Sequence, residues 1–222
     1  MKRKGFLKAL LAGTVTLALS GCGASEIAFS DAEAAKEALN TAGTIYLESN
    51  VRKVMQETDI LADDQVAAYM QEKGIIDNKW IVSIEGKTWF YVKYVTDHTI
   101  NDVEGINSGA TYGYYDEEDI CLGYAQKRLL DDGVNGRDYY MVYLDAEGNP
   151  KEYYSDEYGY YTYDYEGNLL ASGTAEAAGF LNVHDCHVQI TMEEGCGTPI
   201  DFMDKMVMYI GLFKEYGEWY TP

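Results

Sequence analysis

The segment His184-Asp185-Cys186-His187 is the one cluster in the chain whose side-chain types suit a metal ion. On an extended strand, successive side chains alternate between the two faces, so at most two of the four can reach one ion. Further ligands would have to come from elsewhere in the chain, for example from Cys196 or His98. Zinc sites usually carry paired C-x₂₋₄-C or H-x₃₋₅-H spacings, which this segment lacks. Two interpretations stay open: half-buried polar residues, which we favour, or a metal site made by His184, Cys186, His187 and Cys196.

A second group of candidate residues is aromatic, because seven tyrosines lie between residues 153 and 165. Alternation along a strand would place Tyr161, Tyr163 and Tyr165 on one face and Tyr160 on the other. A tyrosine combines an apolar ring with a hydroxyl that stays in water, which suits a partly exposed sheet face or a binding surface. We therefore take these four tyrosines as candidate binding residues, with plain packing in a tyrosine-rich sheet as the alternative.

The stretch YYTYDYEGNLLASG also resembles two families of repeats. One is the YD-type repeat of bacterial surface proteins, and the other is the cell-wall-binding repeat, Tyr-Tyr-Phe/Leu-Asp-x-x-Gly-x-Met/Leu. The residues on the pattern are Tyr163, Asp164, Gly167 and Leu169, whereas the trailing Gly-Trp is absent and Pro150 replaces leucine in the first copy. The resemblance implies glycan binding between stacked copies, and such repeats need several copies to stack.

Signatures of common enzymes are incomplete in this sequence. Gly86-Lys87-Thr88 matches the end of a phosphate-binding loop, but Ile81 occupies the position of the required first glycine. The segment 105–109 has the wrong spacing for a nucleophile elbow. The 37 acidic residues offer too many carboxylate pairs for any one pair to indicate a glycosidase. We therefore predict no catalytic residues and no cofactor.

The first 22 residues have the anatomy of an export signal. Four basic residues precede an apolar run over 9–19, which is far shorter than the ~20 residues needed to cross a bilayer core. The segment ends in Leu19-Ser20-Gly21-Cys22, which resembles the lipobox of bacterial lipoproteins, Leu-[Ala/Ser]-[Gly/Ala]-Cys. The alternative is a plain secretory signal in which the cysteine has no role.

The lipobox resemblance implies that a diacylglyceryl group is added to the Cys22 thiol and that residues 1–21 are removed. Long acyl chains such as palmitate anchor a protein durably, since each buried CH₂ contributes ~0.8 kcal/mol. Residues 22–30 would then be a short tether. We expect the folded part to lie on the extracytoplasmic face of the cell membrane, attached through its N-terminal lipid.

Removal of residues 1–21 would leave 13 basic and 37 acidic residues, a net charge of −24. Such a chain is repelled by phosphate backbones, which argues against nucleic acid as a partner. Anionic lipid surfaces repel it for the same reason, so the lipid would be its only attachment to the membrane. The remaining candidate partners are glycan, peptidoglycan or another envelope protein.

Hydrophobic periodicity predicts an α+β fold, in which N-terminal helices pack on a largely antiparallel, tyrosine-rich β-sheet, as a single domain over 31–222. The helical part, 31–74, would hold a helix from 31 to about 56 capped by Ser30 and a second helix beginning at Asp63-Asp64. Residues 80–192 would be mainly β, with a helix near 116–131 whose acidic start suits the helix dipole. Residues 199–216 could form a C-terminal helix.

Turn chemistry predicts three β-hairpins in this region. The first turns at Glu85-Gly86-Lys87, and the other two turn at the internal repeat D-x-E-G-N, found at 145–149 and 164–168. A further strand is expected over 180–192. Three cysteines with free thiols would remain after lipidation. A disulfide between Cys186 and Cys196 is one possibility, but a hairpin turn at 193–195 would hold the two cysteines too far apart for a direct bridge.

Together these features predict a membrane-anchored, non-catalytic binding or assembly module for an envelope glycan or protein. A metal-dependent or acid–base hydrolase of the envelope is the first alternative. A pilin-like scaffold component is the second, because a long helix, a short helix and a hairpin are loosely similar to pilin ectodomains. Lys8 and Cys22 break the prepilin pattern, however.

Overall fold

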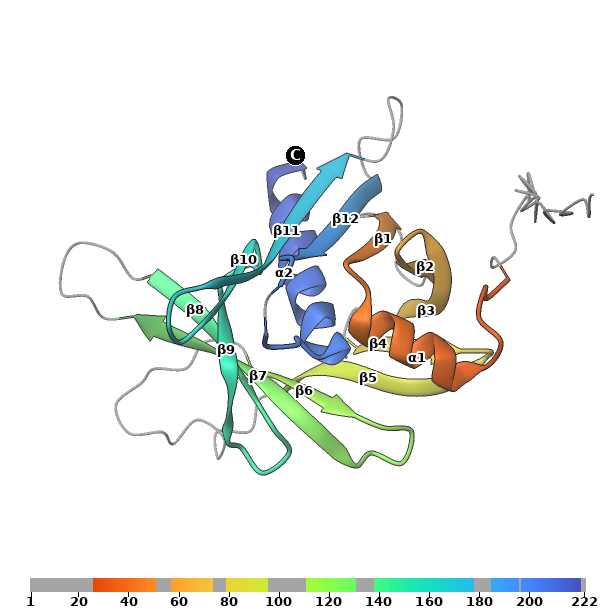
Figure 1. The fold of residues 1–222 in the computed structure, drawn as a ribbon, viewed down its shortest axis with the longest axis horizontal. Coiled ribbons are helices and arrows are strands. Elements are labelled where there is room, and N and C mark those ends of the chain that lie inside the picture. The colour runs from red at the N-terminus through yellow and green to blue at the C-terminus, as the bar shows by residue number, and fades with distance from the viewer. Residues whose placement is uncertain are drawn as a thin grey trace, which may run out of the picture.

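The computed structural model describes residues 26–50, 57–73, 79–95, 111–130, 138–177, 185–195 and 197–220. Within these ranges lie twelve β-strands and two α-helices (Figure 1). The strands are β1 Thr44–Asn50, β2 Glu57–Ala62, β3 Gln65–Lys73, β4 Lys79–Ile84, β5 Lys87–Val95, β6 Thr111–Tyr115, β7 Cys121–Leu130, β8 Asp138–Leu144, β9 Pro150–Asp156, β10 Tyr161–Asp164, β11 Leu169–Ala177 and β12 Asp185–Met192. The helices are α1 Ala32–Thr41 and α2 Phe202–Tyr220.

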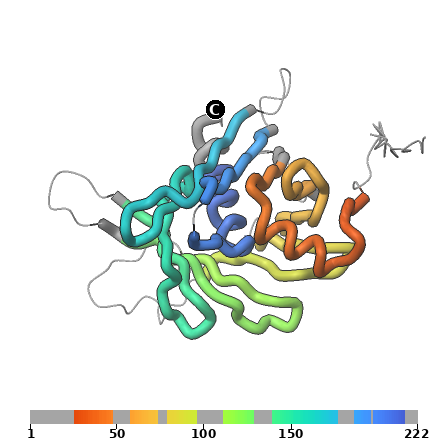
Figure 2. Tube along the Cα trace, viewed as in Figure 1, coloured from red at the N-terminus to blue at the C-terminus, as the bar shows by residue number. Residues whose placement is uncertain are grey.

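The twelve strands form a closed antiparallel barrel. Each strand pairs with its neighbours in the sequence, and β1 pairs with β12 to close the ring, from Thr44 opposite Thr191 to Asn50 opposite Asp185. Figure 2 shows the early, orange strand lying beside the late, blue one at this closure. Closure pairs the edges that an open sheet would expose.

Tight turns connect several of the strands because their residues tolerate a positive φ. The β2–β3 turn uses Asp63 and Asp64, with φ values of 45° and 71°, and the β4–β5 turn uses Glu85 and Gly86, with φ values of 51° and 75°. Two successive residues with positive φ make a turn whose twist matches that of the flanking strands.

Helix α2 lies inside the barrel. Seven consecutive residues, from Asp204 to Ile210, are buried, and about two turns of helix buried on every side must be surrounded by protein. Its contacts reach separate parts of the wall: Phe90 in β5, Tyr112 in β6, Tyr153 in β9 and Thr162 in β10. In Figure 1 the helix runs through the middle of the ring of strands.

A glycine permits the closest approach between this helix and the wall. A Cβ added to Gly211 would lie 2.5 Å from the backbone carbonyl oxygen of Tyr158, which is closer than side-chain carbons come to such atoms. The absence of a side chain at this position therefore lets α2 pack directly against the turn that precedes β10.

Helix α1 is tied to the start of α2. The buried Lys205 ammonium donates hydrogen bonds to the carbonyl oxygens of Leu39 and Asn40, at 3.1 and 3.0 Å. The Asn40 side chain in turn accepts a hydrogen bond of 2.9 Å from the Phe202 amide. A cation at the carbonyl end of a helix is favourable. Lys205 of α2 therefore satisfies free carbonyl groups at the end of α1, and Asn40 of α1 satisfies a free amide at the start of α2.

The predicted α+β fold class is wrong, because the described chain is a closed barrel in which the helix α2 fills the interior. The first predicted helix ends at Thr41 instead of about 56, and β1 follows at once. Its N-cap is Asp31, whose carboxylate accepts a hydrogen bond from the Ala34 amide, and not Ser30.

The predicted helix beginning at Asp63-Asp64 is strand β3 preceded by its turn. Four consecutive residues of this strand, from Ala67 to Met70, are buried, and a register shift opposite Ile60 and Leu61 breaks the alternation at Ala67. A short continuous buried run does not distinguish a strand from a helix.

The predicted helix near 116–131 is also wrong. Asp116 accepts hydrogen bonds from the amides of Glu118 and Ile120, and Asp119 has a φ of 63°. The acidic run is therefore the turn between β6 and β7, and β7 occupies the segment expected to be helical.

The three predicted hairpins are confirmed as β4–β5, β8–β9 and β10–β11. The expected strand over 180–192 is present from Asp185 as β12, and the C-terminal helix is present as α2. Within the described ranges, neither helix combines the length and the apolar character that a membrane span requires.

Candidate functional site

Five tyrosines form a continuous surface on the outer side of β8, β9 and β10 and the turn that follows β10. Neighbouring rings lie with centroids 5.7 to 6.4 Å apart, which is within the range of aromatic contacts. We call this surface the tyrosine face, and its members are Tyr140, Tyr154, Tyr161, Tyr163 and Tyr165.

The face points outward because of the alternation of side chains along β10. Thr162 is fully buried and its hydroxyl lies 3.4 Å from the sulfur of Met208 in α2, so it points into the barrel. Its neighbours Tyr161 and Tyr163 must then point out. Tyr161 is 50% exposed and Tyr165 is 59% exposed, whereas Tyr160 packs against the core. The predicted division of these tyrosines between two faces is confirmed.

The turn before β10 is held by one carboxylate. Asp156 accepts four backbone hydrogen bonds of 2.7 to 3.0 Å, from the amides of Tyr158, Gly159, Tyr160 and Tyr161. This carboxylate therefore fixes the backbone that leads into β10, where the tyrosine face begins.

The turn after β10 is held in a similar way. Asp164 accepts hydrogen bonds from the side chain and the backbone amide of Asn168, and these bonds lower the pKa of its carboxyl group. Asp145 and Asn149 make the same pair of bonds in the β8–β9 turn. The tyrosine face is therefore built on strands whose connections are fixed by side chains.

Arg128 is a cation at the edge of the tyrosine face. It lies opposite Tyr140 in the β7–β8 register, and its Nε donates a hydrogen bond of 3.0 Å to the side chain of Gln126. Burial raises the pKa of the Tyr165 hydroxyl, and the charge of Arg128 opposes that rise. No described lysine or arginine lies over a ring of the face.

A second outer pair of tyrosines has the opposite character, and we call it the covered pair. Tyr91 and Tyr115 stack with centroids 5.4 Å apart. The Lys79 ammonium lies 3.3 Å from the centroid of the Tyr91 ring, and that of Lys93 lies 4.2 Å from the centroid of the Tyr115 ring. Tyr91 also donates a hydrogen bond to Asp119. Lysine ammonium groups of the chain itself therefore already lie over both rings of the covered pair, and a carboxylate of the chain already accepts from the Tyr91 hydroxyl.

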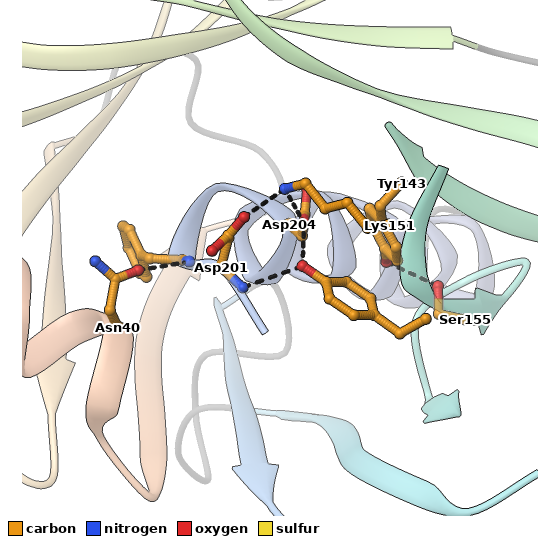
Figure 3. Close-up of polar contacts among 8 residues, drawn as sticks. Asn40, Tyr143, Lys151, Ser155, Asp201 and Asp204 are labelled. Carbon is orange, nitrogen blue, oxygen red and sulfur yellow. Dashed lines mark hydrogen bonds and ion pairs between the residues drawn. The ribbon is translucent and has the colours of Figure 1, made fainter. Parts of the chain in front are cut away.

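A buried polar cluster joins α2 to the barrel wall (Figure 3). Asp204, which is 0% exposed, accepts hydrogen bonds from the Lys151 ammonium at 2.7 Å and from the Tyr153 hydroxyl at 2.5 Å. Lys151 also donates to Asp201 at 2.5 Å, and the Asp201 amide donates to the Tyr153 hydroxyl. We call Asp204, Lys151 and Tyr153, together with the exposed Asp201 at their edge, the buried cluster.

Burial and neighbouring charges shift the pKa values of the buried cluster. Burial raises the pKa of Asp204, against the effect of the Lys151 ammonium. Burial alone would lower the pKa of Lys151, but the carboxylates of Asp204 and Asp201 outweigh it and raise that pKa. Burial and the nearby Asp204 both raise the pKa of the Tyr153 hydroxyl.

These contacts give the buried cluster a structural role. The Asp204 carboxylate has no surface through which a substrate could approach, and it lies in the first turn of α2, where negative charge is favourable. The cluster therefore fixes the start of the internal helix to β9.

The candidate metal ligands do not meet in the described chain. Cys186 is fully buried in β12, while the ring of His187 lies on the outer side, 5.5 Å from that of Tyr46. His184 and Cys196 lie outside the described residues, as does the predicted lipidation site, Cys22. Among the residues that the structure describes, no three histidine, cysteine or acidic side chains are grouped so as to hold a metal ion.

Several residues of these sites were not expected from the sequence. Tyr140 and Tyr154 join the tyrosine face because strand register places them beside β10. Asp204 and Lys151 are 53 positions apart, and only the fold brings them together. A signal for the buried cluster was present: Asp204-Lys205 is a charged pair within the otherwise apolar start of α2.

No family model, no curated protein and no solved structure matches this chain. Its function is therefore inferred from the geometry of the chain itself.

Proposed function

We propose that the protein is a lipid-anchored, extracytoplasmic binding module that holds an envelope glycan or protein on its tyrosine face. The observation that carries this proposal is the face itself: five contacting tyrosines that point outward, with no described cation over their rings. Tyrosines supply a large apolar contact area and a hydroxyl at a small cost in conformational entropy, which is why binding surfaces are rich in them.

The rigidity of the support favours a binding role. The face is built on three paired strands, and the turns on both sides of β10 are fixed by Asp156 and Asp164. A surface that is ordered before its ligand arrives loses less entropy on binding than a mobile one. A preformed surface of this kind suits an extended ligand.

The location is proposed from the leader sequence. The basic start, the apolar run over 9–19 and the lipobox Leu19-Ser20-Gly21-Cys22 support export and lipidation at Cys22. The charge of −24 that follows removal of the leader would keep the barrel away from an anionic membrane surface, with its outer wall accessible to envelope components.

The binding proposal is tested with the full chain, purified in detergent and immobilised. Isolated peptidoglycan sacculi and solubilised envelope proteins are passed over the wild type and the Tyr161→Ala/Tyr163→Ala variant. The matched control is Tyr94→Ala, which removes another exposed tyrosine, 43% exposed, from β5. We expect the wild type and the control to retain the same ligand and the double variant to lose it. Equal retention by all three proteins would exclude the tyrosine face as the binding surface.

The location is tested separately by intact-mass measurement of the protein extracted from membranes. We expect an N-terminal Cys22 that carries acyl chains and no residues 1–21. A Cys22→Ala variant should lose this lipid and leave the membrane fraction. Retention of residues 1–21 in the native protein, or an unmodified Cys22, would contradict the proposal.

A further inference from the structure

We propose that the ligand of the tyrosine face is a lysine-rich segment of an envelope protein, whose ammonium groups lie over the tyrosine rings. This inference rests on the proposed binding function and names the chemistry of its ligand. A cation over an aromatic ring is attracted by the negative face of the ring, and the attraction persists at exposed sites.

Within the chain itself, lysine side chains lie over several of the aromatic rings. Five described lysines lie over aromatic rings, with the ammonium 3.3 to 5.8 Å from the nearest ring centroid: Lys36 on Trp89, Lys79 on Tyr91, Lys93 on Tyr115, Lys127 on Tyr139, and Lys214 on Trp80 and Tyr112. The covered pair is the closest parallel, because Lys79 lies over Tyr91 and Lys93 lies over both of its stacked tyrosines.

The tyrosine face offers the same rings without lysines from the described chain. Its rings contact one another at distances similar to that of the covered pair, which is 5.4 Å between centroids. Two of its tyrosines, Tyr161 and Tyr165, are at least half exposed. An ammonium from a second molecule can therefore take the position that Lys79 and Lys93 occupy on the covered pair.

The charge around the face favours a basic ligand. Glu152 is exposed on the same side of β9 as Tyr154, and the exposed Glu166 follows Tyr165 in the next turn. Arg128 is the one described cation at the edge of the face, beside Tyr140 and close enough to Tyr165 to act on its hydroxyl, and its Nε is bonded to Gln126. The mature chain as a whole would carry −24, and such a field speeds the approach of a cationic ligand and repels an anionic one.

A neutral sugar chain is the competing ligand, and its charge distinguishes it. Sugar rings can stack on tyrosines, but they gain nothing from the acidic surroundings. A lysine-rich segment gains both from contact of its ammonium groups with the rings and from attraction to the negative charge around them. The two ligands are therefore separated by changing the charge of a probe without changing its length.

The test measures binding of three fluorescent peptides and one oligosaccharide to the full chain in detergent. The peptides share one length and alternate serine with lysine, with trimethyl-lysine or with acetyl-lysine, and the sugar is a fluorescent chito-oligosaccharide. We expect the lysine and trimethyl-lysine peptides to bind, because trimethylation keeps the charge, and the acetylated peptide to fail. This comparison uses the unaltered protein and does not depend on the folding of a variant.

The same peptides are then tested on Tyr161→Ala/Tyr163→Ala, which leaves the net charge of the protein unchanged. Loss of two rings should weaken binding of the trimethyl-lysine peptide by about tenfold, whereas Tyr94→Ala should leave it unchanged. Equal binding of lysine and acetyl-lysine peptides would overturn the inference. So would lysine-peptide binding that the double variant retains, since it would report the general negative field and not the rings.

The outcomes separate this inference from the proposed function. Binding of the oligosaccharide that the double variant loses, without binding of the lysine peptide, would overturn the basic ligand and leave the binding function intact. Failure of every probe and of the envelope fractions to bind in a tyrosine-dependent way would overturn both.

Discussion

Tyr153 and Tyr154 are neighbours in the chain and lie on opposite sides of strand β9. Tyr153 points into the barrel, where its hydroxyl donates to the fully buried Asp204 of α2. Tyr154 points outward, where its ring contacts those of Tyr140, Tyr163 and Tyr165. The same residue type thus holds the internal helix on one side of the wall and forms the tyrosine face on the other.

The difference lies in which part of the tyrosine is used. Inside the barrel the Tyr153 hydroxyl is paired with Asp204, and leaving it unpaired would cost about 1–3 kcal/mol. Outside, water serves the hydroxyl, and the ring faces remain accessible. We therefore expect substitutions on the inner side to change stability and substitutions on the outer side to change binding.

The largest effect is expected from Lys151→Met. This variant leaves the buried Asp204 carboxylate without its ion-pair partner, so the free energy of unfolding should fall by about 3–5 kcal/mol. The loss is measured by urea denaturation. The Lys151→Met/Asp204→Leu variant is the control, and it should recover part of the loss because no unpaired charge remains. A single variant as stable as the wild type would exclude a buried ion pair.

Gly211→Ala tests whether α2 is seated against the wall. The added carbon would lie 2.5 Å from the Tyr158 carbonyl oxygen, so the helix must shift, at a cost of about 1–3 kcal/mol. Gly197→Ala is the control, since a carbon added there meets no atom within 4 Å. Thermal denaturation of the two variants should separate them clearly, and similar melting temperatures would contradict the position of α2 inside the barrel.

Tyr153→Phe tests the role of the inner tyrosine through the pH dependence of stability. Because the pKa of Tyr153 is raised above its usual 10.0, the folded chain holds this proton more tightly, and stability should fall as the pH rises above about 10. Below that pH its contribution is fully present. The pKa values of Tyr114 and Tyr143 are raised too, so they act in the same direction.

The measurement for this prediction is the free energy of unfolding at about pH 8 and about pH 11. A phenylalanine side chain cannot ionise, so the decline with pH should be shallower in the variant than in the wild type. The variant should also lose about 1–2 kcal/mol at the lower pH, because Asp204 loses a donor. An unchanged decline would show that Tyr153 takes no part in the alkaline transition.

Tyr161→Ala is the outer counterpart. Its ring is half exposed, so the free energy of unfolding should change by no more than about 0.5 kcal/mol while ligand binding weakens. Chemical denaturation and the peptide assay are run on the same preparation. A large loss of stability would mean that the tyrosine face serves packing, as in the alternative interpretation of the sequence.

The smallest effect is expected from Lys79→Met/Lys93→Met. Removing both ammonium groups uncovers the rings of Tyr91 and Tyr115, so the trimethyl-lysine peptide should gain a second, weak site. The change appears as a second binding phase in a titration. Its absence would indicate that the hydrogen bond of Tyr91 to Asp119, or the shape of the site, prevents binding at the covered pair.

Local chemistry made the turns predictable from the sequence. The D-x-E-G-N repeat forms its two turns through bonds between residues four positions apart, Asp145 to Asn149 and Asp164 to Asn168. The alternation of Tyr160 to Tyr165 follows from the two-residue period of a strand. Neither feature needs information from a distant part of the chain.

The wrong helices arose where local chemistry is ambiguous. Asp63-Asp64 and the acidic run at 116–119 are suitable for a helix start or for a turn, since aspartate caps helices and also tolerates positive φ. The choice between them was made by strand pairing, which joins segments into a ring that closes between β1 and β12.

The sequence by itself determined the hairpin turns, the shared face of Tyr161, Tyr163 and Tyr165 and the negative charge of the chain, and it contains a lipobox-like segment that ends at Cys22. Tertiary structure alone decided that the sheet closes, that α2 lies within it and that Lys151 meets Asp204. The reason is physical: turns and alternation depend on a few adjacent residues, whereas closure and buried charge pairing depend on groups far apart in the chain. Their energies are realised only when the whole barrel excludes water.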